Sequence, residues 1–205
     1  MIISLKDISK RYNTEWILKK INLELAINQQ YAIIGPNGSG KSTFLKIIAN
    51  GIVPTHGNIE YIFSDNSVPS DFVINKNIAF AAPYISILEE MTLAEIYYFH
   101  AGLHQMYCNS LENFLAIIEL EKHKNKYIKH FSSGMKQRVK LGLAILSKTK
   151  ILILDEPSSN LDEKATAWYL SLVQQYLQDR ILLIGSNQER EYSFCQNRIN
   201  VLDYK

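Results

Sequence analysis

Cysteine is scarce in this chain. The 205 residues contain only Cys108 and Cys195. Two cysteines so far apart in the sequence do not form a disulfide framework, and their scarcity favours a reducing cytoplasm. A chain of this length buries about 70% of the surface that its unfolded form exposes. It therefore needs neither disulfides nor a structural metal to stabilise its core.

Long apolar runs and an excess of charge of one sign are missing as well. No apolar run approaches the roughly 18 residues that indicate a membrane-spanning helix. Residues 1–7 are already strand-like and lack the apolar core of a signal peptide. The chain has 22 basic and 20 acidic side chains, so its charge gives no reason to expect nucleic acid as a partner.

Strand and helix patterns alternate along the chain, which predicts an α/β fold around a parallel sheet. A polar stretch over residues 64–77, with Pro69, predicts a loop, and the basic stretch 122–130 predicts an irregular connector. The strands are expected at 2–9, 21–26, 31–34, 57–63, 151–154 and 181–185, and the helices at 42–50, 92–103, 110–120, 132–148 and 163–178.

Residues 35–43 read GPNGSGKST and lie between an apolar run and a helical pattern. This G-x-x-x-x-G-K-[ST] pattern in a strand-to-helix context predicts a phosphate-binding loop. Lys41 is expected to reach the β- and γ-phosphates, and the Ser42 hydroxyl to ligate Mg²⁺. The start of the next helix adds partial positive charge. The expected nucleotide-binding residues of the loop are Asn37, Gly38, Ser39, Gly40, Lys41, Ser42 and Thr43.

Two further segments carry chemistry. Residues 151–156 read ILILDE, a buried strand that ends in two carboxylates. Asp155 is placed to hold Mg²⁺, directly or through water, and Glu156 to orient and deprotonate an attacking water. Residues 131–138 read FSSGMKQR and open a helix with hydroxyls and a glycine, which predicts a second anion-binding helix N-terminus.

With these motifs, essentially the whole chain resembles the nucleotide-binding subunit of ATP-binding cassette (ABC) transporters. Residues 35–43 match that family's phosphate loop, 131–135 its signature segment, 151–156 its Mg²⁺ and catalytic-carboxylate strand, and 158–162 its D-loop. The resemblance implies a RecA-like P-loop NTPase core, a small antiparallel β-subdomain and an inserted α-helical subdomain at about 84–148. These would together form one nucleotide-binding domain over residues 1–205, most similar to small single-cassette subunits such as those of haem exporters.

The resemblance also implies ligands and partners. Tyr12 stands where the family places an aromatic ring that stacks on adenine. Family cassettes pair head to tail, so Ser132, Ser133 and Gly134 would contact the ATP held by a second copy. The implied partners are ATP, Mg²⁺, a second nucleotide-binding subunit and a separate transmembrane permease that holds the chain at the inner face of the membrane. The distance from Lys41 to Ser132 in sequence leaves no room for the long coiled coil of the DNA-repair relatives.

The chain departs from the family pattern at several positions. Pro83 stands where the family usually has a Gln, and Asn187 where it has a switch histidine. Proline offers no side-chain amide, whereas Asn187 can still donate a hydrogen bond to the γ-phosphate. Ser133 and Met135 also replace the usual Gly and Gln of the signature segment. Because Glu156, Lys41, Ser42 and Asp155 all remain, we still expect Mg²⁺-dependent ATP hydrolysis, with Glu156, Lys41 and Asn187 as catalytic residues. Two alternatives stay open: an ATP-gated dimerisation module with weak or no hydrolysis, and a soluble ABC ATPase that acts on nucleic acid or ribosomes.

His100, His104 and Cys108 recur every four residues. That spacing permits metal ligation, but no fourth ligand lies nearby in the sequence, so we expect these side chains to pack rather than to bind metal.

Overall fold

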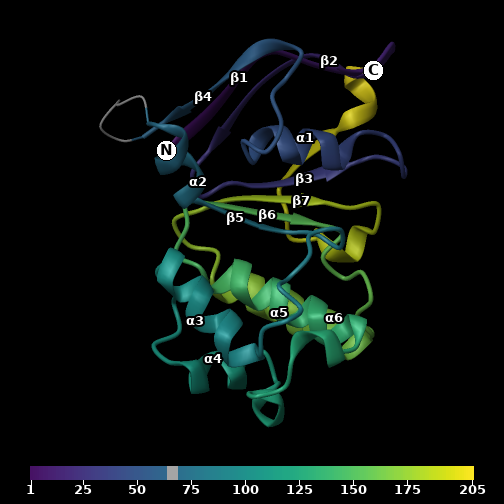
Figure 1. The fold of residues 1–205 in the computed structure, drawn as a ribbon. Coiled ribbons are helices and arrows are strands. Elements are labelled where there is room, and N and C mark those ends of the chain that lie inside the picture. Colours follow the sequence, from purple (N-terminus) through teal and green to yellow (C-terminus); the bar gives the residue numbers. More distant parts are fainter. Residues whose placement is uncertain (64–68) are drawn as a thin grey trace.

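Two sheets and a set of helices make up the computed structural model, which describes residues 1–63 and 69–205 (Figure 1). The first sheet is antiparallel, with strand order β2-β1-β4, and the second is parallel, with order β5-β6-β7-β3-β8. The strands are β1 (Ile2–Tyr12), β2 (Glu15–Ala26), β3 (Gln30–Ile34), β4 (His56–Ile62), β5 (Ile78–Ala81), β6 (Ile151–Asp155), β7 (Ile181–Gly185) and β8 (Asn197–Asn200).

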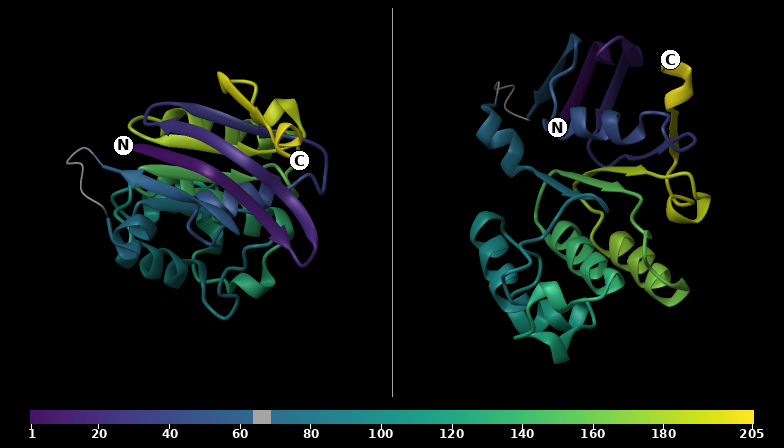
Figure 2. Two further views of the ribbon diagram at one scale, coloured as in Figure 1. Left: turned by 90° about the horizontal axis from the view of Figure 1, so that it is seen from above. Right: turned by 45° about the vertical axis from the view of Figure 1, so that its right-hand side comes forward.

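The helices lie on both faces of the parallel sheet (Figures 1 and 2). One helix, α1, lies between the two sheets, and α3 to α6 cover the opposite face of the parallel sheet. The α-helices are α1 (Lys41–Ile48), α2 (Asp71–Lys76), α3 (Leu93–Leu103), α4 (Leu111–Ile117), α5 (Ser133–Leu146) and α6 (Glu163–Gln175). The short 3₁₀ helices are η1 (Glu121–His123), η2 (Ile128–His130), η3 (Glu189–Glu191) and η4 (Val201–Tyr204).

Strand alternation divides the interior into two hydrophobic layers. Successive side chains of a strand point to opposite faces, and a parallel sheet covered on both faces is apolar throughout. In β6, Ile151 and Ile153 pack with α1 and the antiparallel sheet, whereas Leu152 and Leu154 pack with the helices of the other face. The fully buried central strands therefore fix the position of the two carboxylates at the end of β6, Asp155 and Glu156.

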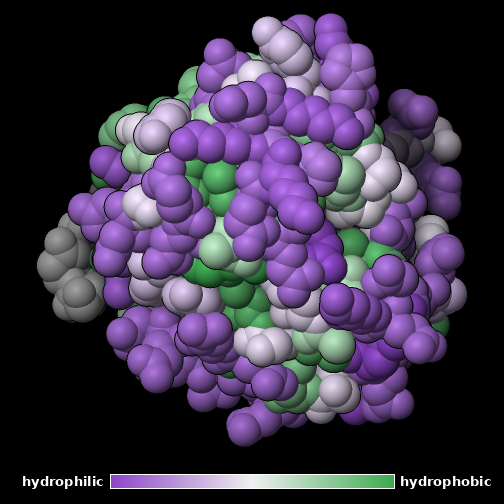
Figure 3. Space-filling view, turned by 90° about the horizontal axis from the view of Figure 1, so that it is seen from below, coloured by the Kyte–Doolittle hydropathy of each residue, from purple (hydrophilic) through white to green (hydrophobic). Residues whose placement is uncertain are grey.

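Figure 3 shows the helical side of the molecule from below, where hydrophilic residues cover most of the surface and hydrophobic ones gather near its middle. Within the described residues, the structure contains no helix with the length and apolar content that crossing a membrane requires.

The predicted α/β fold is confirmed, and β7 has the bounds expected from its apolar run. Among the strands and α-helices, three short ones were not predicted: β5, β8 and α2. The expected loop over 64–77 is wrong for residues 71–76, which form α2, and its residues 64–68 lie outside the described part. Asn50 Nδ2 donates to Asp71 Oδ1 at 3.1 Å, and Ile74 is buried, so tertiary contacts support a helix too short to be stable alone.

Candidate functional site

The loop between β3 and α1 curls tightly around its own carbonyl groups. Gly38 and Gly40 have φ values of 75° and 105°, a region that favours glycine. A Cβ on Gly40 would also lie 2.8 Å from Ile17 Cγ2, so the close approach of β2 requires glycine there. The turn is closed by the Ser39 N–H, which donates to the Pro36 carbonyl at 3.1 Å.

Lys41 is a buried cation at the centre of this loop. Its side chain is 4% exposed, and Nζ donates to the Gly35 and Pro36 carbonyls at 2.8 and 3.1 Å. No carboxylate pairs with it among the described residues. A buried, unpaired ammonium group is costly, so this position favours a bound anion.

A cavity of about 230 Å³ lies against the loop and collects most of the predicted nucleotide-binding residues. Ser39 does not line it: its hydroxyl is buried and has no hydrogen-bond partner within the described ranges. The lining residues are Tyr12, Ile17, Asn37, Gly38, Gly40, Lys41, Ser42, Thr43 and Glu156.

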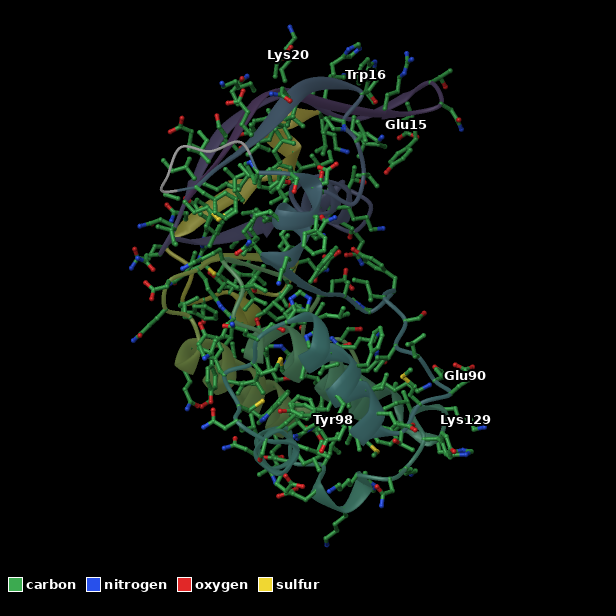
Figure 4. All side chains as sticks on the ribbon, turned by 60° about the vertical axis from the view of Figure 1, so that its left-hand side comes forward. Glu15, Trp16, Lys20, Glu90, Tyr98 and Lys129 are labelled. Atoms are coloured by element: carbon green, nitrogen blue, oxygen red, sulfur yellow. The ribbon has the colours of Figure 1, made fainter. Side chains whose placement is uncertain are left out.

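Tyr12 reaches the cavity from the hairpin that joins β1 and β2. That hairpin, whose turn is followed by Glu15 and Trp16, forms one end of the antiparallel sheet (Figure 4). Tyr12 is 46% exposed, and Lys10 Nζ lies 5.1 Å from its ring centroid. Tyr12 and Ile17 thus add an aromatic and an aliphatic side chain to a cavity that Lys41 also lines, which suits an aromatic base joined to phosphates.

Asp155, the last residue of β6, and Glu156, which follows it, lie in two different environments. Asp155 is 1% exposed; its Oδ2 accepts from Tyr84 Oη at 2.9 Å, and its Oδ1 has no partner in the described part of the chain. Glu156 has a φ of 45°, rare for a residue with a side chain, and its N–H donates to the Gly185 carbonyl at 2.8 Å. This local strain places Glu156, but not Asp155, in the lining of the cavity.

Asn187 is brought to the phosphate loop by the segment that follows β7. Its Nδ2 donates to Asn37 Oδ1 at 3.1 Å, across 150 residues of sequence. The Ser186 N–H donates to the Ile33 carbonyl at 3.2 Å, which ties this segment to β3. The side chain therefore stands at the rim of the loop, although it does not line the cavity itself.

The predicted signature residues lie apart from this cavity. Ser132 caps α5, and its Oγ accepts from the Met135 N–H at 3.2 Å. Ser132 and Gly134 line a second cavity of about 290 Å³, which shares no residue with the first, and Ser133 lines a third hollow. Within one copy, the structure does not bring residues 132–134 to the phosphate loop.

Two contacts near the site were not predicted. Burial, and then the negative charge of Asp155, raise the pKa of Tyr84, so its hydroxyl stays protonated and donates to Asp155. Glu191 is fully buried; it accepts from the Ser158 N–H at 3.2 Å and also contacts the Ser158 hydroxyl. Neither contact has a sequence signal, because each joins residues far apart in the chain.

The oxygen atoms around Asp155 fit a hard divalent cation. Asp155 Oδ1 is buried without a partner, and the Ser42 side chain lies beside the Tyr84 hydroxyl that contacts Asp155. Mg²⁺ prefers one or two protein oxygens together with waters and phosphates.

His100, His104 and Cys108 do not converge on one point. His100 Nε2 lies 2.7 Å from Ser147 Oγ, whereas the Cys108 sulfur lies 4.0 Å from the Tyr97 hydroxyl. Burial lowers the pKa of His100 to about 4. Within the residues that the structure describes, no three His, Cys, Asp or Glu side chains gather as a metal site.

Comparison with known proteins decides the family. The sequence profile described as "ABC transporter" matches residues 18–159, well over half of the chain. The chain belongs to the ABC transporter family. Its fold is that of an ABC ATPase cassette: the solved structure described as an ABC transporter ATP-binding protein from Pyrococcus furiosus superimposes with a TM-score of 0.82 and 26% identity, covering all of both chains.

Two relatives show how the ABC cassette occurs in longer proteins. The uncharacterized ABC transporter ATP-binding protein YcbN of Bacillus subtilis is 30% identical over 208 residues, which cover 98% of this chain and 66% of that protein. The human phospholipid-transporting ATPase ABCA3 is 29% identical over 209 residues, which cover 98% of this chain and 12% of that protein. The chain thus spans less than two thirds of these relatives, and their substrates are not carried over to it.

Proposed function

We propose that this chain binds ATP with Mg²⁺ and hydrolyses it to energise a membrane-spanning transporter subunit that is a separate chain. The observation that carries the proposal is the buried, carboxylate-free Lys41 ammonium, which faces the same cavity as Tyr12 and Glu156. Family membership supports the same function.

Different residues of the cavity bind the adenine and the phosphates of ATP. Tyr12 stacks on the adenine, while Lys41 and the backbone N–H groups of residues 37–43 bind the phosphates at the N-terminus of α1. Mg²⁺, held by Ser42 and Asp155, would neutralise charge on the phosphates.

Hydrolysis then depends on two side chains near the γ-phosphate. Glu156 lines the cavity and accepts the proton of the attacking water. Asn187 donates its amide N–H to the γ-phosphate in place of the bond that it makes to Asn37. Because Asn187 carries no titratable group, it orients the phosphate without exchanging a proton.

A second copy completes the site in this proposal. Ser132, Ser133 and Gly134 lie outside the cavity of their own chain, so the helix N-terminus that they form is available to the ATP of a partner. A head-to-tail pair would contain two such sites. We propose that the transporter subunit moves with the opening and closing of this pair, at the inner face of the membrane.

A specific observation favours a second candidate, the ATP-gated dimerisation module. Pro83 offers no amide at the expected Gln position, and Asn187 is already hydrogen-bonded to Asn37. Both features lower the expected rate of hydrolysis without weakening ATP binding.

Calorimetric titration of Lys41→Ala with MgATP tests the proposal. Loss of a charged hydrogen-bond partner should weaken binding by about 10- to 100-fold. The matched control is Lys6→Ala, which removes an exposed lysine of β1 that pairs with Glu60, and it should bind like the wild type. Equal affinity of Lys41→Ala and the wild type would show that this loop is not the nucleotide site.

A further inference from the structure

Tyr84 lies where three parts of the fold meet around the end of β6. It follows β5, and its ring packs edge-on against Phe80 at a centroid distance of 6.4 Å. Lys46 Nζ of α1 lies over the same ring, 4.1 Å from its centroid. Contacts from β5 and α1 therefore restrict the ring, although the residue is 46% exposed.

The hydroxyl of Tyr84 contacts the buried carboxylate. Oη donates to Asp155 Oδ2 at 2.9 Å, and the Ser42 side chain lies beside it. Within the described ranges no other side chain hydrogen-bonds to Asp155, and Oδ1 is buried without a partner. One oxygen of the carboxylate is thus fixed by Tyr84, and the other is buried close to Gly185 without a hydrogen-bond partner in the described residues.

A lysine of α5 holds the backbone before Tyr84 through hydrogen bonds. Lys140 Nζ donates to the Pro83 carbonyl at 2.8 Å and to the Ala82 carbonyl at 3.3 Å. Lys140 belongs to the helix that begins after Ser132. A continuous chain of contacts therefore runs from α5 through residues 82–84 to Asp155.

We propose that Tyr84 is a positioning residue for the divalent cation at the nucleotide site. By donating to Asp155 Oδ2, its hydroxyl fixes the orientation of the carboxylate that would hold the cation together with Ser42. Groups that orient a metal ligand typically change metal affinity by about 10- to 100-fold. The inference rests on the proposed function, because it concerns the Mg²⁺ of the same site.

Tyr84→Phe removes only the hydroxyl and separates metal binding from nucleotide binding. Free Mn²⁺ is measured by electron paramagnetic resonance in the presence of a β,γ-imido analogue of ATP, with the protein in excess so that the analogue is bound. We expect the variant to bind Mn²⁺ about 10-fold more weakly than the wild type. Its affinity for the analogue in EDTA should be unchanged, because the phosphate loop is intact.

Tyr98→Phe is the matched control. Tyr98 lies on the outer face of α3 and is 62% exposed, so its variant should bind Mn²⁺ like the wild type (Figure 4). Equal melting temperatures would show that both variants are folded. Wild-type Mn²⁺ affinity in Tyr84→Phe, or an equal loss of analogue binding in EDTA, would overturn the inference. If the wild type does not bind the analogue at all, the proposed function fails with it.

Discussion

The backbone around Lys41, Glu156 and Asn187 determines where each of these side chains lies. Lys41 is fixed by two carbonyls of its own loop, and Glu156 is turned toward the cavity by a positive φ. Asn187 contacts the loop through one side-chain hydrogen bond, from its Nδ2 to Asn37 Oδ1. The motifs predicted these positions because each belongs to a segment that follows a strand of the parallel sheet, at the edge where the strand ends converge.

Asn187 gives the sharpest prediction at the residue scale. If its amide donates to the γ-phosphate, Asn187→Ala should lower steady-state phosphate release by about 10-fold, the value of one hydrogen bond to a charged group. Asn187→His should preserve or raise the rate, because an imidazole can donate the same bond. Phosphate release is measured with the transporter subunit present. Equal rates for all three proteins would show that Asn187 does not contact the reacting phosphate.

At the scale of the elements, the sequence predicted the helices that are long and the strands that are strongly apolar. The runs of β6 and β7 and the helices α3, α5 and α6 were predicted because their patterns do not depend on neighbours. β5 and β8 have four residues each and exist as edge partners of β6 and β3. The Tyr84–Asp155 bond joins residues 71 apart, and its existence follows from the β5–β6 pairing. No spacing rule could have predicted these elements or this bond.

The close packing of β6, β7 and α1 gives a prediction for Gly185. A Cβ there would lie 2.6 Å from Leu45 Cδ1 and 2.8 Å from Asp155 Oδ1. Gly185→Ala should therefore lower the free energy of unfolding by about 1–3 kcal/mol, as over-packing does. Denaturant unfolding measures the change.

Gly102→Ala on α3 is the control for this substitution. A Cβ on Gly102 meets nothing within 4 Å, so alanine should stabilise the helix by up to about 1 kcal/mol. If Gly185→Ala is as stable as the wild type, α1 is free to move away from β7, and the packing around Asp155 is looser than described.

At the scale of the whole molecule, the two predicted anion-binding regions lie apart and line cavities that share no residue. The phosphate loop holds the Lys41 cation and lies beside the proposed base Glu156, whereas the start of α5 is a second helix N-terminus without either side chain. This division is the physical reason to propose a head-to-tail pair of chains. The motifs predicted both regions, and the family resemblance implied that they serve different copies; the fold shows that they line separate cavities within one chain. The assignment of residues 1–205 to one nucleotide-binding domain stays a prediction.

Phosphate release by Glu156→Gln tests most directly whether this cavity hydrolyses ATP. An amide cannot accept the proton of the attacking water, so release should fall at least about 100-fold while MgATP binding is retained. Because ATP then persists, light scattering should show the variant as a stable dimer. Glu90→Gln, in the segment before α3, is the matched control and should release phosphate like the wild type (Figure 4). Wild-type turnover in Glu156→Gln would contradict the role of Glu156 as the base, and ATP-driven dimers without any release from the wild type would contradict hydrolysis itself.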